Sequence, residues 1–166
     1  MIRISPRLLW MALALGSAGL VAGSFGLTAL LKLHPCHLCI FQRLLFMILA
    51  LLGAVAAWQV AQPAGRWAGM LSLPVSAVGI AVATYQSWLQ AQPTGTVSCS
   101  AGQPGLIEQI VEWLGGRLPQ LFMATGFCEE AELWILGLSL ANWALVSFTA
   151  SFAVAIWAFL RLRRRD

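Results

Sequence analysis

Long stretches of the chain carry no charged residue, and this feature limits the fold more than any other. The first stretch runs over residues 8–31 and can cross a bilayer, since a spanning helix needs about 20 residues. Three further apolar runs follow at about 40–60, 67–89 and 143–160. Hydrophobic residues make up 60% of the chain and charged residues only 10%, whereas a soluble domain carries about a quarter charged residues. The sequence therefore predicts an integral membrane protein with four transmembrane helices.

The first apolar run also carries glycines at helical spacing. Gly19 and Gly23 form a pair of small residues four positions apart, which allows another helix to approach closely, and Gly16 and Gly26 extend the same face. We expect this face to pack against a second helix. A cleaved signal peptide is the alternative interpretation of the run, although the apolar part of such a peptide is shorter, about 7–15 residues.

Residues 90–142 differ from the rest of the chain and predict one long extramembrane loop, rich in glycine, proline and acidic residues. Within it, residues 106–114 place apolar side chains on one helical face and end at Gly115 and Gly116. This short amphipathic helix would lie in the membrane interface or pack on the rest of the loop. The predicted fold is an all-α membrane protein, a four-transmembrane-helix bundle with one short and one long outer loop, forming a single domain over residues 1–166.

The basic residues lie mainly at the ends of the apolar runs and predict the orientation. In a four-span arrangement seven of the ten fall on one side and three on the other, which fits the positive-inside rule. We expect both termini to be cytoplasmic and all four cysteines to be on the outer side. No basic patch is interleaved with aromatic residues, so nucleic acid is not an expected partner. The seven are Arg3, Arg7, Arg66, Arg161, Arg163, Arg164 and Arg165, and the three are Lys32, Arg43 and Arg117.

Cys36 and Cys39 form a C-x-x-C pair where the second span begins, with Pro35 favouring a helix start there. The free N–H groups and the positive end of the helix dipole at such a position lower the pKa of a thiol and favour the thiolate that attacks disulfides. The pair is therefore a candidate redox centre. A purely structural disulfide is an alternative, although so small a closed loop stabilises little.

Two other uses of the C-x-x-C pair also need consideration. Haem attachment requires a histidine directly after the second cysteine, and that position is Ile40, so it is excluded. A zinc site could combine the pair with His34 or His37, but the remaining cysteines lack the close spacing of zinc ligands. We expect no metal.

Cys99 and Cys128 both lie in the long outer loop. A disulfide between them could simply hold the loop together. Because disulfides on one membrane face exchange by thiolate attack, two cysteine pairs could instead form an electron relay. Such a relay needs a final acceptor, and the membrane supplies lipid-soluble quinone.

Arg43 lies about one turn beyond Cys39, inside the apolar run, where a charged side chain is costly and indicates function. Its guanidinium could stabilise both a Cys39 thiolate and the charge that grows on a quinone oxygen during reduction. An arginine that anchors the helix in the headgroups is the alternative.

Two segments resemble the bacterial disulfide bond formation protein DsbB family. Residues 36–43, Cys-His-Leu-Cys-Ile-Phe-Gln-Arg, are similar to its C-x-L-C-x-x-x-R signature, and residues 118–128 are similar to its P-x-x-F-x-A-x-G-x-C segment. The resemblance spans nearly the whole chain. It implies a protein of the bacterial inner membrane that reoxidises a periplasmic, thioredoxin-like DsbA-type partner and passes electrons to ubiquinone or menaquinone.

The resemblance also implies a role for each cysteine. Cys99 would form the mixed disulfide with the partner, Cys128 would exchange with Cys36, and Cys39 with Arg43 would face the quinone. All four cysteines are thus predicted catalytic residues, with Cys39 and Arg43 also binding the quinone. The alternative function is a non-catalytic membrane scaffold or a metal-handling protein with structural disulfides.

The chain departs from the family pattern at two positions. Family members often have an acidic residue where Gln42 stands, and some have a histidine where Ser87 aligns. The resemblance therefore assigns no role to either side chain.

Overall fold

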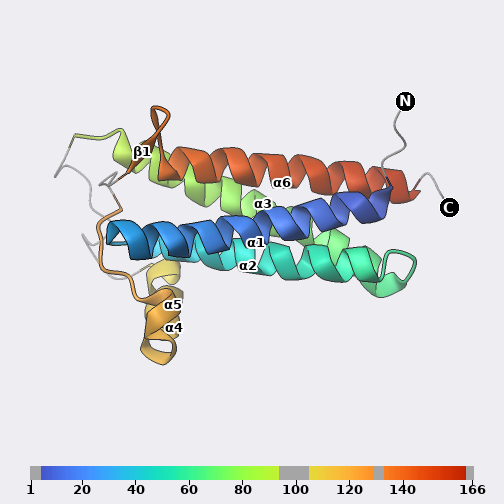
Figure 1. Ribbon diagram of the computed structural model, residues 1–166, viewed down its shortest axis with the longest axis horizontal. Helices are drawn as coiled ribbons and strands as arrows, with labels where there is room; N and C mark the ends of the chain where they lie inside the picture. Colours follow the sequence, from blue (N-terminus) through green and yellow to red (C-terminus); the bar gives the residue numbers. More distant parts are fainter. Residues whose placement is uncertain (1–4, 94–104, 129–132, 164–166) are drawn as a thin grey trace.

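A computed structural model describes residues 5–93, 105–128 and 133–163, and four long helices dominate it (Figure 1). These helices are α1 (Pro6–Leu31), α2 (His37–Trp58), α3 (Pro63–Gln90) and α6 (Leu140–Arg163). All four are long and apolar enough to cross a membrane. The prediction of an all-α membrane protein with four spanning helices is therefore confirmed, with helix ends shifted by a few residues.

The four helices lie side by side and give the bundle two distinct ends (Figure 1). Helix α1 packs mainly on α2, α2 packs also on α3, and α3 packs also on α6, while the contact between α1 and α6 is smaller. The cysteine end is formed where α1 and α3 end and where α2 and α6 begin. The opposite end holds the start of α1, the turn between α2 and α3, and the end of α6.

At the opposite end, small residues let the helices pack closely around Trp10, which is fully buried. The Trp10 indole lies against Gly69, where an added Cβ would come within 2.8 Å of the ring. In the same way, a Cβ added at Gly53 of α2 would lie 2.9 Å from the backbone nitrogen of Ala14 on α1. Buried alanines of α2, α3 and α6 complete this core.

The glycines of α1 have the opposite environment. A Cβ added at any of the four would meet no atom within 4 Å, and the four are Gly16, Gly19, Gly23 and Gly26. The expectation that this face packs tightly against another helix is therefore wrong. Gly19 and Gly23 instead line a cavity at the cysteine end.

The long loop contains the predicted amphipathic helix, α4 (Leu106–Arg117), followed by the single turn α5 (Pro119–Phe122). The apolar face of α4 packs on α2, because Ile107, Val111 and Leu114 meet side chains around Ile40. In Figure 1 the two short helices project from the side of α2 at the cysteine end. Leu106 and Trp113 remain exposed on the outer face of α4, so its predicted position in the membrane interface stays a prediction.

A small β-hairpin, absent from the sequence-based prediction, leads into α6. Strand β1 (Trp134–Ile135) pairs antiparallel with β2 (Leu138–Ser139). The two turn residues Leu136 and Gly137 have φ of 52° and 79°, as in the mirror-image turns that suit hairpins. The Ser139 hydroxyl donates to Gln90 Oε1 at 2.7 Å, which fixes the hairpin to the end of α3.

Candidate active site

Three cysteines meet at the cysteine end because the loop after α5 is held against the turn before α2. The carbonyl oxygen of Pro35 accepts hydrogen bonds from the backbone N–H groups of Thr125 at 2.9 Å and Gly126 at 3.3 Å. Gly126 lies so close to His34 that no Cβ would fit there. Cys128 follows two residues later and is buried beside Cys36.

Cys36 occupies the N-cap of α2 rather than its first turn, since the helix begins one residue later, at His37. Its Sγ accepts a hydrogen bond from the backbone N–H of Cys39 at 3.5 Å. The two sulfur atoms lie 3.2 Å apart, which is longer than the S–S bond of about 2.05 Å, so the structure holds the pair as free thiols.

The Cys36 thiol differs from the thiolate expected of a residue at a helix start. Hydrogen bonds to Cys128 and to Cys39, together with burial, hold the pKa of Cys36 well above its usual value. The sequence-based expectation of a lowered pKa is therefore wrong for this residue, because its sulfur neighbours outweigh the helix dipole. The reduced Cys36 therefore forms little thiolate and is a weak nucleophile.

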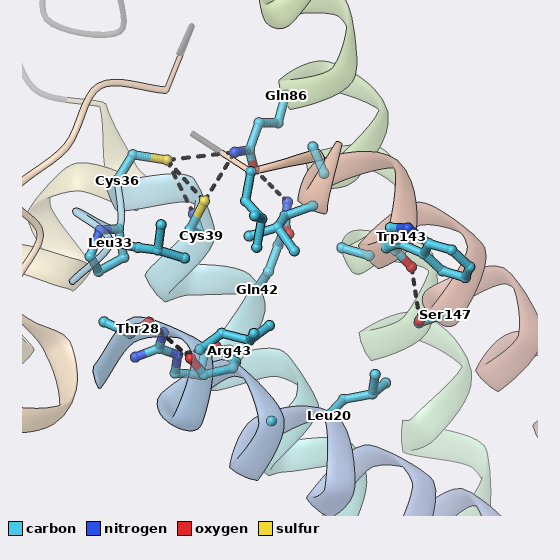
Figure 2. Close-up of a pocket in the computed structure, with 18 of the residues that line it drawn as sticks. Leu20, Thr28, Leu33, Cys36, Cys39, Gln42, Arg43, Gln86, Trp143 and Ser147 are labelled. Atoms are coloured by element: carbon cyan, nitrogen blue, oxygen red, sulfur yellow. Dashed lines mark hydrogen bonds between the residues drawn. The ribbon is translucent and has the colours of Figure 1, made fainter. Parts of the chain in front are cut away.

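Two buried glutamines lie beside the C-x-x-C pair, as Figure 2 shows. Gln86 Nε2 donates to Cys39 Sγ at 3.0 Å and lies 3.6 Å from Cys36 Sγ. Gln42 Nε2 in turn donates to Gln86 Oε1 at 2.9 Å. An amide from α2 and an amide from α3 therefore form a chain of hydrogen bonds that ends on sulfur.

Arg43 lies one turn beyond Cys39, and its guanidinium is directed toward α1 (Figure 2). Its Nε donates to Ser24 Oγ at 2.8 Å, and a terminal nitrogen donates to Thr28 Oγ1 at 3.0 Å. The guanidinium carbon also lies 4.2 Å from the centre of the Phe25 ring. The side chain is 6% exposed, so a fixed positive charge is held within the bundle by neutral groups.

A cavity of about 520 Å³ opens between α1, α2, α6 and the hairpin at this level. The residues that line it include Cys36, Cys39, Gln42, Gln86 and Arg43, and its wall is otherwise mainly apolar. The volume suits a ligand of the size of an aromatic ring system with substituents. Cys39 thus borders a space that could hold an apolar small molecule.

The site brings together Cys36, Cys39 and Cys128, with Arg43 close by, while Cys99 lies outside the described residues. Ser87 donates to the backbone carbonyl of Ala83 at 2.9 Å. Within residues 5–93, 105–128 and 133–163, no three His, Cys, Asp or Glu side chains gather as metal ligands would.

Gln86 is the site residue that sequence reasoning missed. The last turn of the third apolar run, residues 84–87, is more polar than the rest of the run, and this was the available signal. A buried polar side chain needs a hydrogen-bond partner, so a glutamine in an apolar run indicates a hydrogen bond to another polar group within the bundle.

Comparison with known proteins agrees with this geometry. Residues 6–158 match the family model described as "Disulfide bond formation protein DsbB". Disulfide bond formation protein B of Dechloromonas aromatica is 42% identical over 162 residues, covering 96% of each chain. Disulfide bond formation protein B 2 of Burkholderia lata is 40% identical over 154 residues, covering 89% of this chain and 85% of the relative.

A third relative, disulfide bond formation protein B of Azoarcus sp., is 33% identical over 160 residues, covering 96% of this chain and 95% of its own. The family match includes all three cysteines of the site, both glutamines and Arg43. The chain therefore belongs to the DsbB family, and it is a membrane disulfide oxidoreductase of disulfide bond formation.

Proposed function

We propose that this protein is a thiol:quinone oxidoreductase of the bacterial inner membrane, which reoxidises a periplasmic DsbA-type dithiol oxidase. The observation that carries the proposal is the contact of three cysteines, two of which line one cavity. Cys128 reaches Cys36 from the loop, and Cys39 lines the cavity. The chain acts as a single membrane domain, with the cysteine end periplasmic and both termini cytoplasmic, as the distribution of basic residues favours.

The relay begins at the loop pair, with a disulfide between Cys99 and Cys128. A thiolate of the reduced partner attacks Cys99, forms a mixed disulfide and releases Cys128 as a thiolate. The second thiol of the partner then displaces Cys99, so that the partner leaves with its own disulfide. Two electrons have now entered the loop pair.

The second exchange takes place between the described cysteines. The Cys128 thiolate attacks Cys36 Sγ, the bond between Cys36 and Cys39 breaks, and Cys39 leaves as a thiolate. The hydrogen bond between Cys128 and Cys36 places the attacking sulfur beside Cys36, so this attack needs no rearrangement of the loop. Cys99 then attacks Cys128, restores the loop disulfide and leaves Cys36 and Cys39 as the reduced pair.

The residues around the cavity fit a quinone. The apolar wall suits a ring carried by a lipid chain, and the Arg43 guanidinium supplies fixed positive charge near an oxygen on which negative charge would develop. When bound, a quinone supplies the oxidising power by accepting two electrons and two protons from the dithiol. Arg43 and Cys39 are the residues that would hold it.

Quinone reduction by the purified protein tests this function. A lipid nanodisc preparation with a short-chain quinone and a reduced DsbA-type partner should turn over, and Cys36→Ser or Cys39→Ser should abolish turnover. Thr149→Ala is a matched polar control, because its exposed hydroxyl only bonds the carbonyl of Leu145. Undiminished turnover in either cysteine variant would contradict the relay and favour a scaffold, and stoichiometric zinc after purification would favour a metal-handling protein.

A further inference from the structure

The two glutamines are unusual because they are polar side chains buried within apolar spans. Gln42 is 5% exposed and Gln86 is 1% exposed. Burying an amide costs free energy unless its hydrogen bonds are made, so such residues remain in a bundle only with partners. The partners here are each other and the sulfur atoms of the reactive pair.

The protonation state of Cys39 Sγ decides which end of the Gln86 amide can form a hydrogen bond with it. A thiol can donate or accept, so it would tolerate either end of the Gln86 amide. A thiolate can only accept, and it therefore requires the N–H end, which is the observed arrangement. Gln42 then has to donate to the remaining oxygen of Gln86, and it does so at 2.9 Å.

The two distances from Gln86 distinguish between the cysteines. Its Nε2 lies 3.0 Å from Cys39 Sγ and 3.6 Å from Cys36 Sγ, so the stronger hydrogen bond goes to Cys39. The Arg43 donors described above are engaged with Ser24 and Thr28 instead. Among the hydrogen bonds of the described residues, the one side-chain amide that donates to Cys39 is that of Gln86.

We propose that Gln86 is a catalytic residue whose amide stabilises the negative charge on Cys39 Sγ when the bond between Cys36 and Cys39 opens, and that Gln42 is the positioning residue that keeps this amide in the donating orientation. The inference rests on the proposed function and deepens it. It explains how attack by Cys128 at Cys36 is favoured, since the leaving sulfur is received by a preorganised donor. It also gives Gln42 a role that an ionised carboxylate could not fill, because a carboxylate only accepts.

An intramolecular exchange tests this inference without partner or quinone. In the Cys99→Ser protein, oxidised to one disulfide, Cys128 competes with Cys39 for Cys36. One form has the bond between Cys36 and Cys39 and a free Cys128, and the other has the bond between Cys36 and Cys128 and a free Cys39. Acid quenching stops exchange by removing thiolate. Maleimide trapping and mass spectrometry then give the ratio of free Cys39 to free Cys128.

The expected result is a fall of about tenfold in this ratio for Gln86→Met. Gln42→Met should shift the ratio in the same direction but less, and the double variant should match Gln86→Met, because Gln42 acts only through Gln86. Gln92→Met is the matched control and should leave the ratio unchanged, since its amide only bonds the carbonyl of Trp88 near the end of α3.

A ratio for Gln86→Met within twofold of the parent would overturn the role of Gln86. Additive effects of the two substitutions would overturn the positioning role of Gln42, because independent sites add. If Gln86→Met fails to fold, Gln42→Met alone decides, because it leaves Gln86 in place and must still lower the ratio. Absence of quinone turnover in the parent protein, together with the expected fall in the ratio for Gln86→Met, would count against the proposed function and not against the glutamines.

Discussion

Glycines at the two ends of the bundle have opposite surroundings, although they occupy similar positions in apolar helices. At the opposite end Gly53 and Gly69 allow close contact, and an added Cβ would strike Ala14 or Trp10. Near the cysteine end Gly19 and Gly23 border open space. Small residues thus serve close packing at one end and border a cavity at the other. The same sequence pattern cannot distinguish these uses, because each requires only the absence of a side chain.

The largest expected effect is a loss of stability at the opposite end. Gly69→Leu places a branched side chain where the Trp10 indole already lies, so we expect it to cost about 3 kcal/mol of unfolding free energy or to prevent folding. Denaturant titration in detergent measures this. Gly16→Leu is the matched control, because no atom lies within 4 Å of its added Cβ. An equal loss in both variants would remove the distinction between the two ends.

Arg43→Ala should have the next largest effect, on activity at the cysteine end. We expect the KM for quinone to rise about thirtyfold, which is about 2 kcal/mol, because the variant removes the fixed charge beside the cavity. Exchange between the cysteine pairs should continue at close to its original rate. Normal quinone kinetics would instead identify Arg43 as a link between α2 and α1, through its bonds to Ser24 and Thr28.

Gly23→Leu tests directly whether the open space near the cysteine end binds a ligand. Gly23 lines the cavity, and a Cβ added there meets no atom of the described residues within 4 Å, so the unfolding free energy should change by less than about 1 kcal/mol. The KM for quinone should nevertheless rise about tenfold, since the volume for the ring is reduced. Steady-state kinetics beside a melting curve would show this separation. A variant with unchanged KM would place the quinone elsewhere.

The smallest expected effect comes from Gly19→Ala. A methyl group at this position meets no atom within 4 Å, and alanine favours a helix over glycine by about 0.5–1 kcal/mol. We therefore expect a slight stabilisation with little change in turnover. A clear destabilisation, measured by the same denaturant titration, would show that α1 approaches another helix more closely than the structure describes.

The sequence was sufficient to predict the spanning helices, the loop helix and the closeness of Cys36 to Cys39, because each is encoded locally. Uncharged runs set the spans, and the C-x-x-C spacing places two thiols together. The partnership of Gln42 with Gln86 could not be predicted in this way, since 44 residues separate them and only the packing of α2 on α3 joins them.

Two errors in the prediction have a similar physical origin. The glycine face of α1 was expected to be packed, and the Cys36 thiol was expected to have a low pKa. In both cases the arrangement of distant parts of the chain overrode a local rule. No other helix among the described residues comes close to Gly19, and the sulfur of Cys128 lies beside Cys36. Tertiary surroundings decide the properties of both residues.

The pair of hydrogen bonds on the Pro35 carbonyl has a kinetic consequence. Thr125 and Gly126 are fixed there, and Cys128 is only two residues away from Gly126, so its sulfur stays beside Cys36. A thiol on a flexible tether has an effective concentration of about millimolar, whereas oriented groups held in contact reach values many orders of magnitude higher. In the proposed relay, the speed of the attack of Cys128 on Cys36 should therefore depend on these two hydrogen bonds more than on the length of the loop that precedes them.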